Sequence, residues 1–303
     1  MIFRCPSPFR PPGAVRYSRD CDARAGTRSG DRAARSSSDG TGVPSTVNTV
    51  QGQARQWSRH AARYDEVFLD PFRPGVENPL LAALEAVPDP ESKTVADLGC
   101  GTGPLLPHLV GRFGTVIALD FAPGMIARAQ QRLGPDAAQV VFEVRAMDDL
   151  DAYAGRLDVA VAVNSLVMPD VRVIDRVLRS VRASLAPGGV FLGVVPAIDA
   201  QHYHTMLLVD QALERGQAPE EAERLAAVHG EHRYYDFAFG RFQFQGLRQK
   251  FWQPFEIRYR MRKAGFASVE LGQVLYPWDE DVIGGADFAE HPRSWDWSFT
   301  ARP

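Results

Sequence analysis

Residues 95–103 read VADLGCGTG, and this stretch decides the fold that we expect for the chain. A short apolar run that contains one acid, Asp97, ends in a loop with glycine at every second position, at Gly99, Gly101 and Gly103. Glycine has no Cβ and adopts positive φ readily, so such a loop lets the backbone approach a ligand closely. The helix expected next adds unpaired N–H groups at its first turn. The stretch therefore predicts a strand, a ligand-binding loop and a helix.

Apolar runs continue the alternation of strands and helices along the first two thirds of the chain. The pattern predicts strands at residues 94–98, 116–119, 140–144, 159–163 and 190–195. It predicts helices over residues 104–112, 123–133 and 171–185, and helical segments within residues 54–87. Continuous apolar strands that alternate with helices are typical of a parallel sheet covered on both faces. The fold class that we predict is α/β, with a doubly wound, mostly parallel, Rossmann-like sheet.

The alternation stops after Pro196 and resumes near residue 258. The intervening sequence predicts helices over 204–215 and 219–229 and then a stretch rich in aromatic residues, which we interpret as a helical and aromatic insertion after the fifth strand. Two further strands are predicted at 267–271 and 295–300. The expected units are a ligand-binding core over 43–197, an inserted substrate or lid region over 198–257, and a C-terminal completion of the core sheet over 258–303.

The first 42 residues differ from the rest of the chain. They contain eight arginines and four aspartates but no lysine or glutamate, and they lack periodic apolar residues. Such a segment cannot bury enough surface to offset the entropy of ordering, so we predict that residues 1–42 are disordered. Their arginine and serine content is similar to that of an organellar transit peptide, and the four aspartates argue against one. An extended or wrongly chosen start of the chain is an equal alternative, so import into an organelle stays open.

Composition and charge exclude several classes of protein. Of the 303 residues, 45% are hydrophobic and 23% are charged, which are ordinary globular values. No apolar run reaches the roughly 20 residues of a membrane-spanning helix, and a net charge of −3 gives no basic face for nucleic acid. The three cysteines, Cys5, Cys21 and Cys100, leave an odd thiol in any disulfide scheme, and no HExxH or CxxC pattern is present. We therefore expect a cytoplasmic protein that binds no metal and neither a membrane nor a nucleic acid.

A second acid, Asp120, ends the predicted strand after the glycine loop. Doubly wound folds place an acid at the end of this strand, where its oxygens accept hydrogen bonds from ribose hydroxyls. The loop and the acid together indicate an adenosine-containing ligand at the carboxyl edge of the sheet. Over residues 54–197 and 256–272 the chain resembles a class I S-adenosylmethionine-dependent methyltransferase, with Pro187-Gly188-Gly189 and Ala264-Gly265-Phe266 as further matches.

The resemblance implies a set of residues that bind the cofactor, S-adenosyl-L-methionine. By position in the motifs these residues are Tyr64, Asp97, Gly99, Gly101, Gly103, Asp120, Phe121, Met125, Met147 and Asp148, to which Asn164 is added at the end of the fourth strand. One departure concerns adenine, because Ala146 stands where many relatives carry an acid. The contacts to adenine are then expected from Asp148 or from the backbone.

The implied reaction is an in-line displacement in which the acceptor's nucleophile attacks the methyl carbon of the sulfonium. Positioning the reactants and excluding water can supply much of the catalysis, and a general base is needed only for an acceptor with a high pKa. Two alternatives stay open. A glycine loop followed by an acid also describes a site for NAD in an oxidoreductase, although here the loop reads GxGxG rather than GxGxxG. The other alternative is a protein that binds adenosylmethionine without turnover.

The predicted insertion supplies the candidates for the acceptor site. It leaves the sheet at the carboxyl edge, and its aromatic side chains suit a partly apolar, small organic acceptor. The catalytic candidates are His202, Tyr203 and His204, which are residue types that move protons. Residues 164–167 read NSLV rather than the Asn-Pro-Pro-aromatic motif of amine-methylating enzymes that act on nucleic acids. The sequence leaves the acceptor atom and the oligomeric state open.

Overall fold

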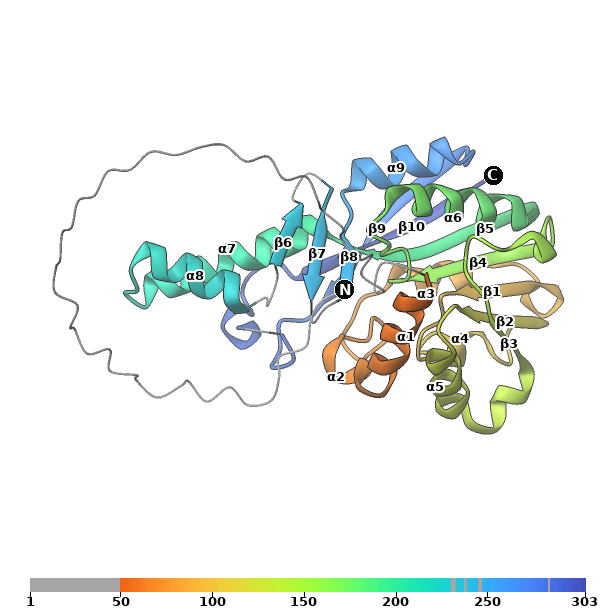
Figure 1. The fold of residues 1–303 in the computed structure, drawn as a ribbon, viewed down its shortest axis with the longest axis horizontal. Helices are drawn as coiled ribbons and strands as arrows, with labels where there is room; N and C mark the ends of the chain where they lie inside the picture. The colour runs from red at the N-terminus through yellow and green to blue at the C-terminus, as the bar shows by residue number, and fades with distance from the viewer. Residues whose placement is uncertain (1–49, 230–232, 237–238, 245–246, 283) are drawn as a thin grey trace, which may run out of the picture.

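The computed structural model describes residues 50–303 except 230–232, 237–238, 245–246 and 283, so the predicted disorder of residues 1–42 lies outside the described residues. A seven-stranded sheet with the order β3-β2-β1-β4-β5-β10-β9 forms the centre of the fold (Figure 1). Its strands are β1 (Thr94–Leu98), β2 (Thr115–Asp120), β3 (Val140–Val144), β4 (Leu157–Val163), β5 (Leu185–Pro196), β9 (Ser268–Tyr276) and β10 (Ser294–Arg302). The first five strands pair in parallel, and β10 runs antiparallel to both β5 and β9. The predicted doubly wound, mostly parallel sheet is confirmed.

Helices cover both faces of this sheet (Figure 1). They are α1 (Val50–His60), α2 (Tyr64–Val67), α3 (Pro79–Glu85), α4 (Leu106–Leu109), α5 (Pro123–Leu133), α6 (Val171–Ser184), α7 (Ile198–Glu214), α8 (Pro219–His229) and α9 (Pro254–Lys263). Successive strand residues point to opposite faces, so Val95 of β1 packs in the core under α3, α4 and α5, whereas Ala96 packs in the core under α6 and α9. Both faces of β1 are thus buried, which explains its continuous apolar sequence.

Two elements differ from the sequence-based expectation. The helix expected over 104–112 is limited to α4: Pro107 is placed in its first turn, where a missing N–H costs nothing, and the chain leaves the helix at Val110 before a turn with φ of +74° at Gly111. The aromatic-rich stretch forms a three-stranded antiparallel sheet of β6 (Arg233–Asp236), β7 (Arg241–Phe244) and β8 (Leu247–Lys250), whose strands were not predicted. Helices α7 and α8 and this small sheet lie between β5 and α9 in the chain.

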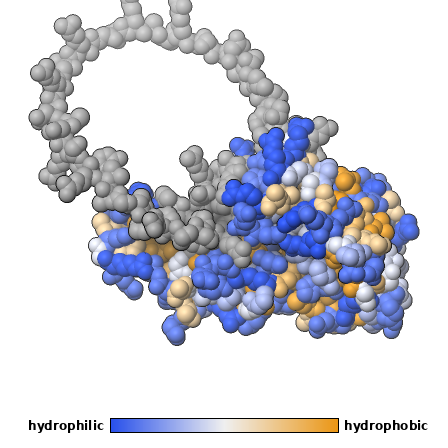
Figure 2. All heavy atoms as spheres, turned by 90° about the horizontal axis from the view of Figure 1, so that it is seen from below, coloured by the Kyte–Doolittle hydropathy of each residue, from blue (hydrophilic) through white to orange (hydrophobic). Residues whose placement is uncertain are grey.

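The surface is of mixed polarity. Figure 2 shows hydrophilic residues interspersed with apolar ones over the face that it presents. Among the described residues, no helix is both long enough and apolar enough to cross a bilayer.

We expect Gly193 to be essential for the packing of β5 against β10. A Cβ at this position would lie 2.4 Å from the carbonyl oxygen of Ala162 and 2.4 Å from Cζ of Phe299. Gly193→Ala should therefore lower the free energy of unfolding by about 1–3 kcal/mol, as overpacking of a core does. Urea denaturation measures this loss. The control is Val141→Ala on the edge strand β3, where the side chain is 49% exposed and the expected change is within about 0.5 kcal/mol; equal effects of the two substitutions would contradict the prediction.

Candidate active site

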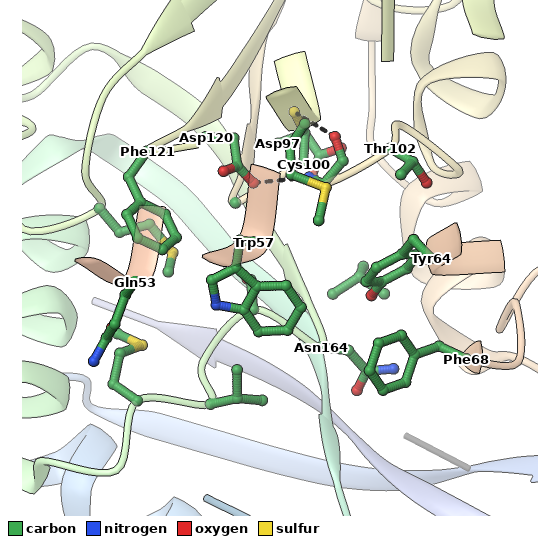
Figure 3. Close-up of a pocket in the computed structure, with 18 of the residues that line it drawn as sticks. Gln53, Trp57, Tyr64, Phe68, Asp97, Cys100, Thr102, Asp120, Phe121 and Asn164 are labelled. Atoms are coloured by element: carbon green, nitrogen blue, oxygen red, sulfur yellow. Dashed lines mark hydrogen bonds between the residues drawn. The ribbon is translucent and has the colours of Figure 1, made fainter. Parts of the chain in front are cut away.

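A cavity opens at the carboxyl ends of β1, β2 and β4, beneath the N-terminal helices (Figure 3). Its lining contains ten of the eleven residues predicted to bind the cofactor. These are Tyr64, Asp97, Gly99, Gly101, Asp120, Phe121, Met125, Met147, Asp148 and Asn164. The strand order explains this gathering, because β2, β1 and β4 are consecutive in the sheet and all three end at the same edge.

The three glycines of the loop have positive φ but different surroundings. A Cβ at Gly99 would lie 2.6 Å from Cβ of Ser165, and one at Gly103 would lie 3.0 Å from Cβ of Ala129, so both positions allow close packing of the loop. Gly103 does not line the cavity, and its surroundings are those of a packing residue. A Cβ at Gly101 would meet nothing within 4 Å, although its φ of +55° disfavours side chains. Gly101 is thus the glycine of the loop that borders open space.

Asp120 connects the glycine loop to the next helix. One carboxylate oxygen accepts a hydrogen bond from the backbone N–H of Gly101 at 3.0 Å, and the other accepts from the N–H of Ala122 at 2.8 Å. Burial raises the pKa of Asp120 to about 6, and these two N–H groups counteract the rise. A carboxylate oxygen has further lone pairs, so both oxygens can still accept hydroxyl groups of a ligand.

Asp97 is buried in the wall of the cavity, where no described side chain or backbone group pairs with it. Its side chain is 1% exposed, and neither carboxylate oxygen has a hydrogen-bond donor among the described residues. Burial, together with the nearby charge of Asp120, raises the pKa of Asp97 to about 8. An isolated buried carboxylate is costly, so a cationic ligand in the cavity would satisfy a group for which the described part of the chain supplies no partner.

The side of the cavity near β3 is built from the residues that follow β2 and β3. Phe121 and Met147 line it, and so does Ala146, which replaces the acid of many relatives. Asp148 accepts a hydrogen bond from Nε of Arg176 at 3.3 Å, which holds this acid at the cavity wall. A flat apolar ring with polar edges fits between such groups.

Three aromatic rings from the N-terminal helices cover the cavity, and sequence analysis identified only one of them as a site residue. Trp57 of α1, Tyr64 of α2 and Phe68 form a tilted cluster, with the ring centroids of Tyr64 and Phe68 4.8 Å apart (Figure 3). The cluster has a polar anchor, since the hydroxyl of Thr102 donates to a carboxylate oxygen of Asp65 at 3.3 Å. Asp65 also forms an ion pair with Arg132 of α5. The family resemblance placed Tyr64 in an element that covers the cofactor, but nothing in the sequence indicated that Trp57 and Phe68 belong to the same cover.

The structure does not bring the predicted catalytic residues His202, Tyr203 and His204 to this cavity. They lie on α7, where the Tyr203 hydroxyl donates to the carbonyl of Pro292 at 3.1 Å. The His204 ring lies 5.3 Å from that of Trp278, in an aromatic cluster beside the main core. Burial lowers the pKa of His202, and the charge of Asp199 opposes this effect. From the predicted insertion, the described residue that lines the cavity is Arg248 of β8.

Comparison with known proteins gives a consistent result. Residues 95–189 match the family described as a methyltransferase domain. A methyltransferase of Claviceps purpurea (strain 20.1) is 36% identical over 99 residues, which cover 32% of this chain and 30% of that protein. The ubiquinone biosynthesis O-methyltransferase of Xanthomonas axonopodis pv. citri (strain 306) is 29% identical over 209 residues, which cover 66% of this chain and 74% of that protein.

Solved structures agree on the fold. The structure described as a DhpI-SAM-HEP complex superimposes with a TM-score of 0.52 at 19% identity and covers 84% of this chain and 97% of that chain. Between the methyltransferase and the NAD-dependent oxidoreductase that the sequence left open, the family match decides for the former. The family match and the named relatives support a class I S-adenosylmethionine-dependent methyltransferase, with its methyltransferase domain over residues 95–189.

Proposed function

We propose that the protein transfers the methyl group of S-adenosylmethionine to a small organic acceptor by in-line displacement. The observation that carries the proposal is Asp97, a buried carboxylate to which no described residue donates a hydrogen bond and which borders a cavity beside Gly101 and Asp120. Adenosylmethionine carries an ammonium group, ribose hydroxyls and an adenine ring. The cavity offers a carboxylate, a second carboxylate and an apolar slot in the same order along the sheet edge, from β1 through β2 to β3.

Each part of the cavity then has a role in holding the cofactor. Asp97 is the partner for the ammonium group, Asp120 accepts the ribose hydroxyls, and Phe121 and Met147 flank adenine. The cofactor supplies an electrophilic methyl group on a sulfonium. Trp57 and Phe68 exclude water from this group, and fixing both reactants in the cavity can contribute about 7–11 kcal/mol to the reaction.

The acceptor would enter beyond the end of β4, next to the methyl group. Val167, Met168 and Pro169 line the cavity there, with Arg248 of β8 as the charged group. An apolar wall with one cation suits a small organic molecule, and the relative from Xanthomonas axonopodis is named for ubiquinone biosynthesis. We include the unit predicted over 198–257 in this acceptor region because β8 belongs to it. A cytoplasmic location and the absence of nucleic-acid substrates remain part of the proposal.

A general base at this site would be a carboxylate. Among the described residues that line the cavity there is no histidine, whereas Asp65 and Asp70 are present. An acceptor that is already ionised at neutral pH would need no base at all.

Titration calorimetry with adenosylmethionine, adenosylhomocysteine and NAD tests the proposal at the level of binding. We expect the first two ligands to bind and NAD not to bind. Release of adenosylhomocysteine in the presence of a panel of small phenols, carboxylic acids and amines then tests turnover. Binding without release for any acceptor class would favour a protein that binds adenosylmethionine without turnover.

Asp120→Ala should weaken adenosylmethionine binding at least tenfold. The substitution removes a charged acceptor for the ribose, and hydrogen bonds to charged groups contribute about 1.5–3 kcal/mol. Calorimetry on protein whose fold is verified by circular dichroism measures the loss. The control is Asp149→Ala, since the Asp149 side chain is 66% exposed and does not line the cavity. An unchanged affinity in folded Asp120→Ala would remove Asp120 from the site.

Asp97→Asn should change how the stability of the ligand-free protein depends on pH. The pKa of Asp97 is raised from its ordinary 3.8 to about 8, so the folded protein binds this proton more tightly than the unfolded chain does. Stability should therefore fall as pH rises from about 4 to about 8, and the asparagine variant should lack this loss. We expect the variant to melt at least about 2 °C above the wild type at pH 8.5, with a smaller difference at pH 5.

Asp97→Asn should also weaken adenosylmethionine binding about tenfold, because the ammonium group loses an ionic partner. Thermal melts across the pH range, with Asp149→Asn as the control, together with calorimetry measure both effects. Parallel pH profiles for the wild type and Asp97→Asn would contradict the assignment of the raised pKa.

A further inference from the structure

Asn164 lies at the end of β4 in a conformation that is unusual for a residue other than glycine. Its φ is +50°, and its backbone N–H continues the β4–β5 ladder by donating to the carbonyl of Val194 at 2.8 Å. Asparagine tolerates the left-handed region better than most residues do, but the conformation still costs free energy. Asn164 is 7% exposed and lines the cavity. The turn therefore fixes a polar side chain at the cavity wall.

A buried network from the C-terminal strand pair holds the amide of Asn164. Its Nδ2 donates to Oδ2 of Asp296 in β10 at 3.3 Å, and the same oxygen accepts the hydroxyl of Tyr276 in β9 at 2.9 Å. Asp296 is 1% exposed and Tyr276 is fully buried. Burial and the charge of Asp296 raise the pKa of Tyr276, so the tyrosine stays a hydroxyl donor.

This network allows one orientation of the amide. Oδ2 of Asp296 already accepts from Tyr276, so the atom of Asn164 that faces it must be a donor. A flipped amide would place Oδ1 against a carboxylate oxygen. The amide oxygen must then point the other way, and it is buried without a hydrogen-bond partner among the described residues. A buried acceptor of this kind calls for a donor or a cation from a ligand.

The position of β4 indicates which part of the ligand this would be. Asp97 in the neighbouring β1 has two oxygens for the ammonium group, and β4 lies on the side of β1 away from Asp120 and the ribose. The remaining cationic part of adenosylmethionine is the sulfonium with its polarised methyl group.

We infer that Asp296 and Tyr276 are positioning residues, which orient Asn164 so that its Oδ1 faces the sulfonium methyl group of the cofactor. The inference rests on the proposed function and deepens it. The C-terminal strand pair thereby takes part in selecting the charged methyl donor over the neutral product, although neither Asp296 nor Tyr276 lines the cavity.

Calorimetry with three ligands tests this inference without any turnover. Adenosylmethionine carries the sulfonium methyl, adenosylhomocysteine lacks it, and sinefungin carries an amine in its place. Asn164→Gly keeps the left-handed turn accessible and removes the amide. We expect this substitution to lower the affinity for adenosylmethionine about fivefold more than the affinity for adenosylhomocysteine, because a C–H···O contact is lost. The affinity for sinefungin should fall about tenfold relative to that for adenosylhomocysteine, because the amine of sinefungin loses a charge-assisted hydrogen bond.

The ratio of the ligand affinities tests the role of Asp296 and Tyr276. A substitution that only disturbs the structure would lower all the affinities together and leave this ratio unchanged. Tyr276→Phe removes one hydroxyl and should lower the preference for sinefungin over adenosylhomocysteine about threefold, because Asp296 can then rotate away from Asn164. Tyr203→Phe is the matched control, since its hydroxyl donates to Pro292 outside the network and its loss should leave the preference unchanged. Asp296→Asn, which retains an acceptor, should stay close to the wild type in this ratio.

Several results would overturn the inference. If Asn164→Gly lowered the affinities for all three ligands equally, or left their ratios unchanged, Oδ1 would not face the methyl group. An unchanged preference in folded Tyr276→Phe alongside a changed one in Asn164→Gly would remove the positioning role. If the wild type bound none of the three ligands, the proposed function itself would fail, and that result is distinct from a loss of preference.

Discussion

The rest of the site depends on the two hydrogen bonds that the carboxylate of Asp120 accepts from the backbone. By accepting the N–H groups of Gly101 and Ala122, the carboxylate fixes the glycine loop after β1 relative to the turn that begins α5. Helix α5 in turn carries the N-terminal cover, because the N–H of Gly124 donates to the hydroxyl of Ser58 at 3.2 Å. One buried acid thus fixes the glycine loop relative to α5, and α5 in turn fixes the helices that cover the cavity. The cavity is therefore already formed in the folded protein.

Asp97 shows the opposite balance between stability and function. Asp120 has two backbone donors that offset its burial, whereas Asp97 has none among the described residues. Asp97 raises the free energy of the folded protein when no ligand is bound. Because its carboxylate is already desolvated on folding, a cationic ligand can pair with it without a further desolvation cost for this group. Burial of both acids at one sheet edge also explains why each has a raised pKa rather than the low pKa of a surface carboxylate.

The sequence predicted those parts of the fold whose signals are local. Helix α5 was predicted with its observed bounds, because Pro123 and Gly134 mark its ends. Tertiary contacts decided what could not be predicted. The strands of the small sheet are each four residues long, which is too short for an alternating pattern such as Arg-Phe-Gln-Phe in β7 to identify a strand. His204 is directed toward Trp278 by packing that the sequence of α7 does not encode. The pairing of Asn164 with Asp296 joins positions 132 residues apart, and only the order of strands in the finished sheet brings them together.

The place of Trp57 in the cavity wall affects the fluorescence of the protein. The Trp57 indole belongs to the cavity wall, whereas the other four tryptophans of the chain, Trp252, Trp278, Trp295 and Trp297, do not line it. Indole emission responds to aromatic neighbours and to the removal of water, so occupancy of the cavity changes the fluorescence of one known residue. The protein therefore contains an intrinsic reporter of its own ligand, and stopped-flow fluorescence can follow cofactor arrival without a dye or a label.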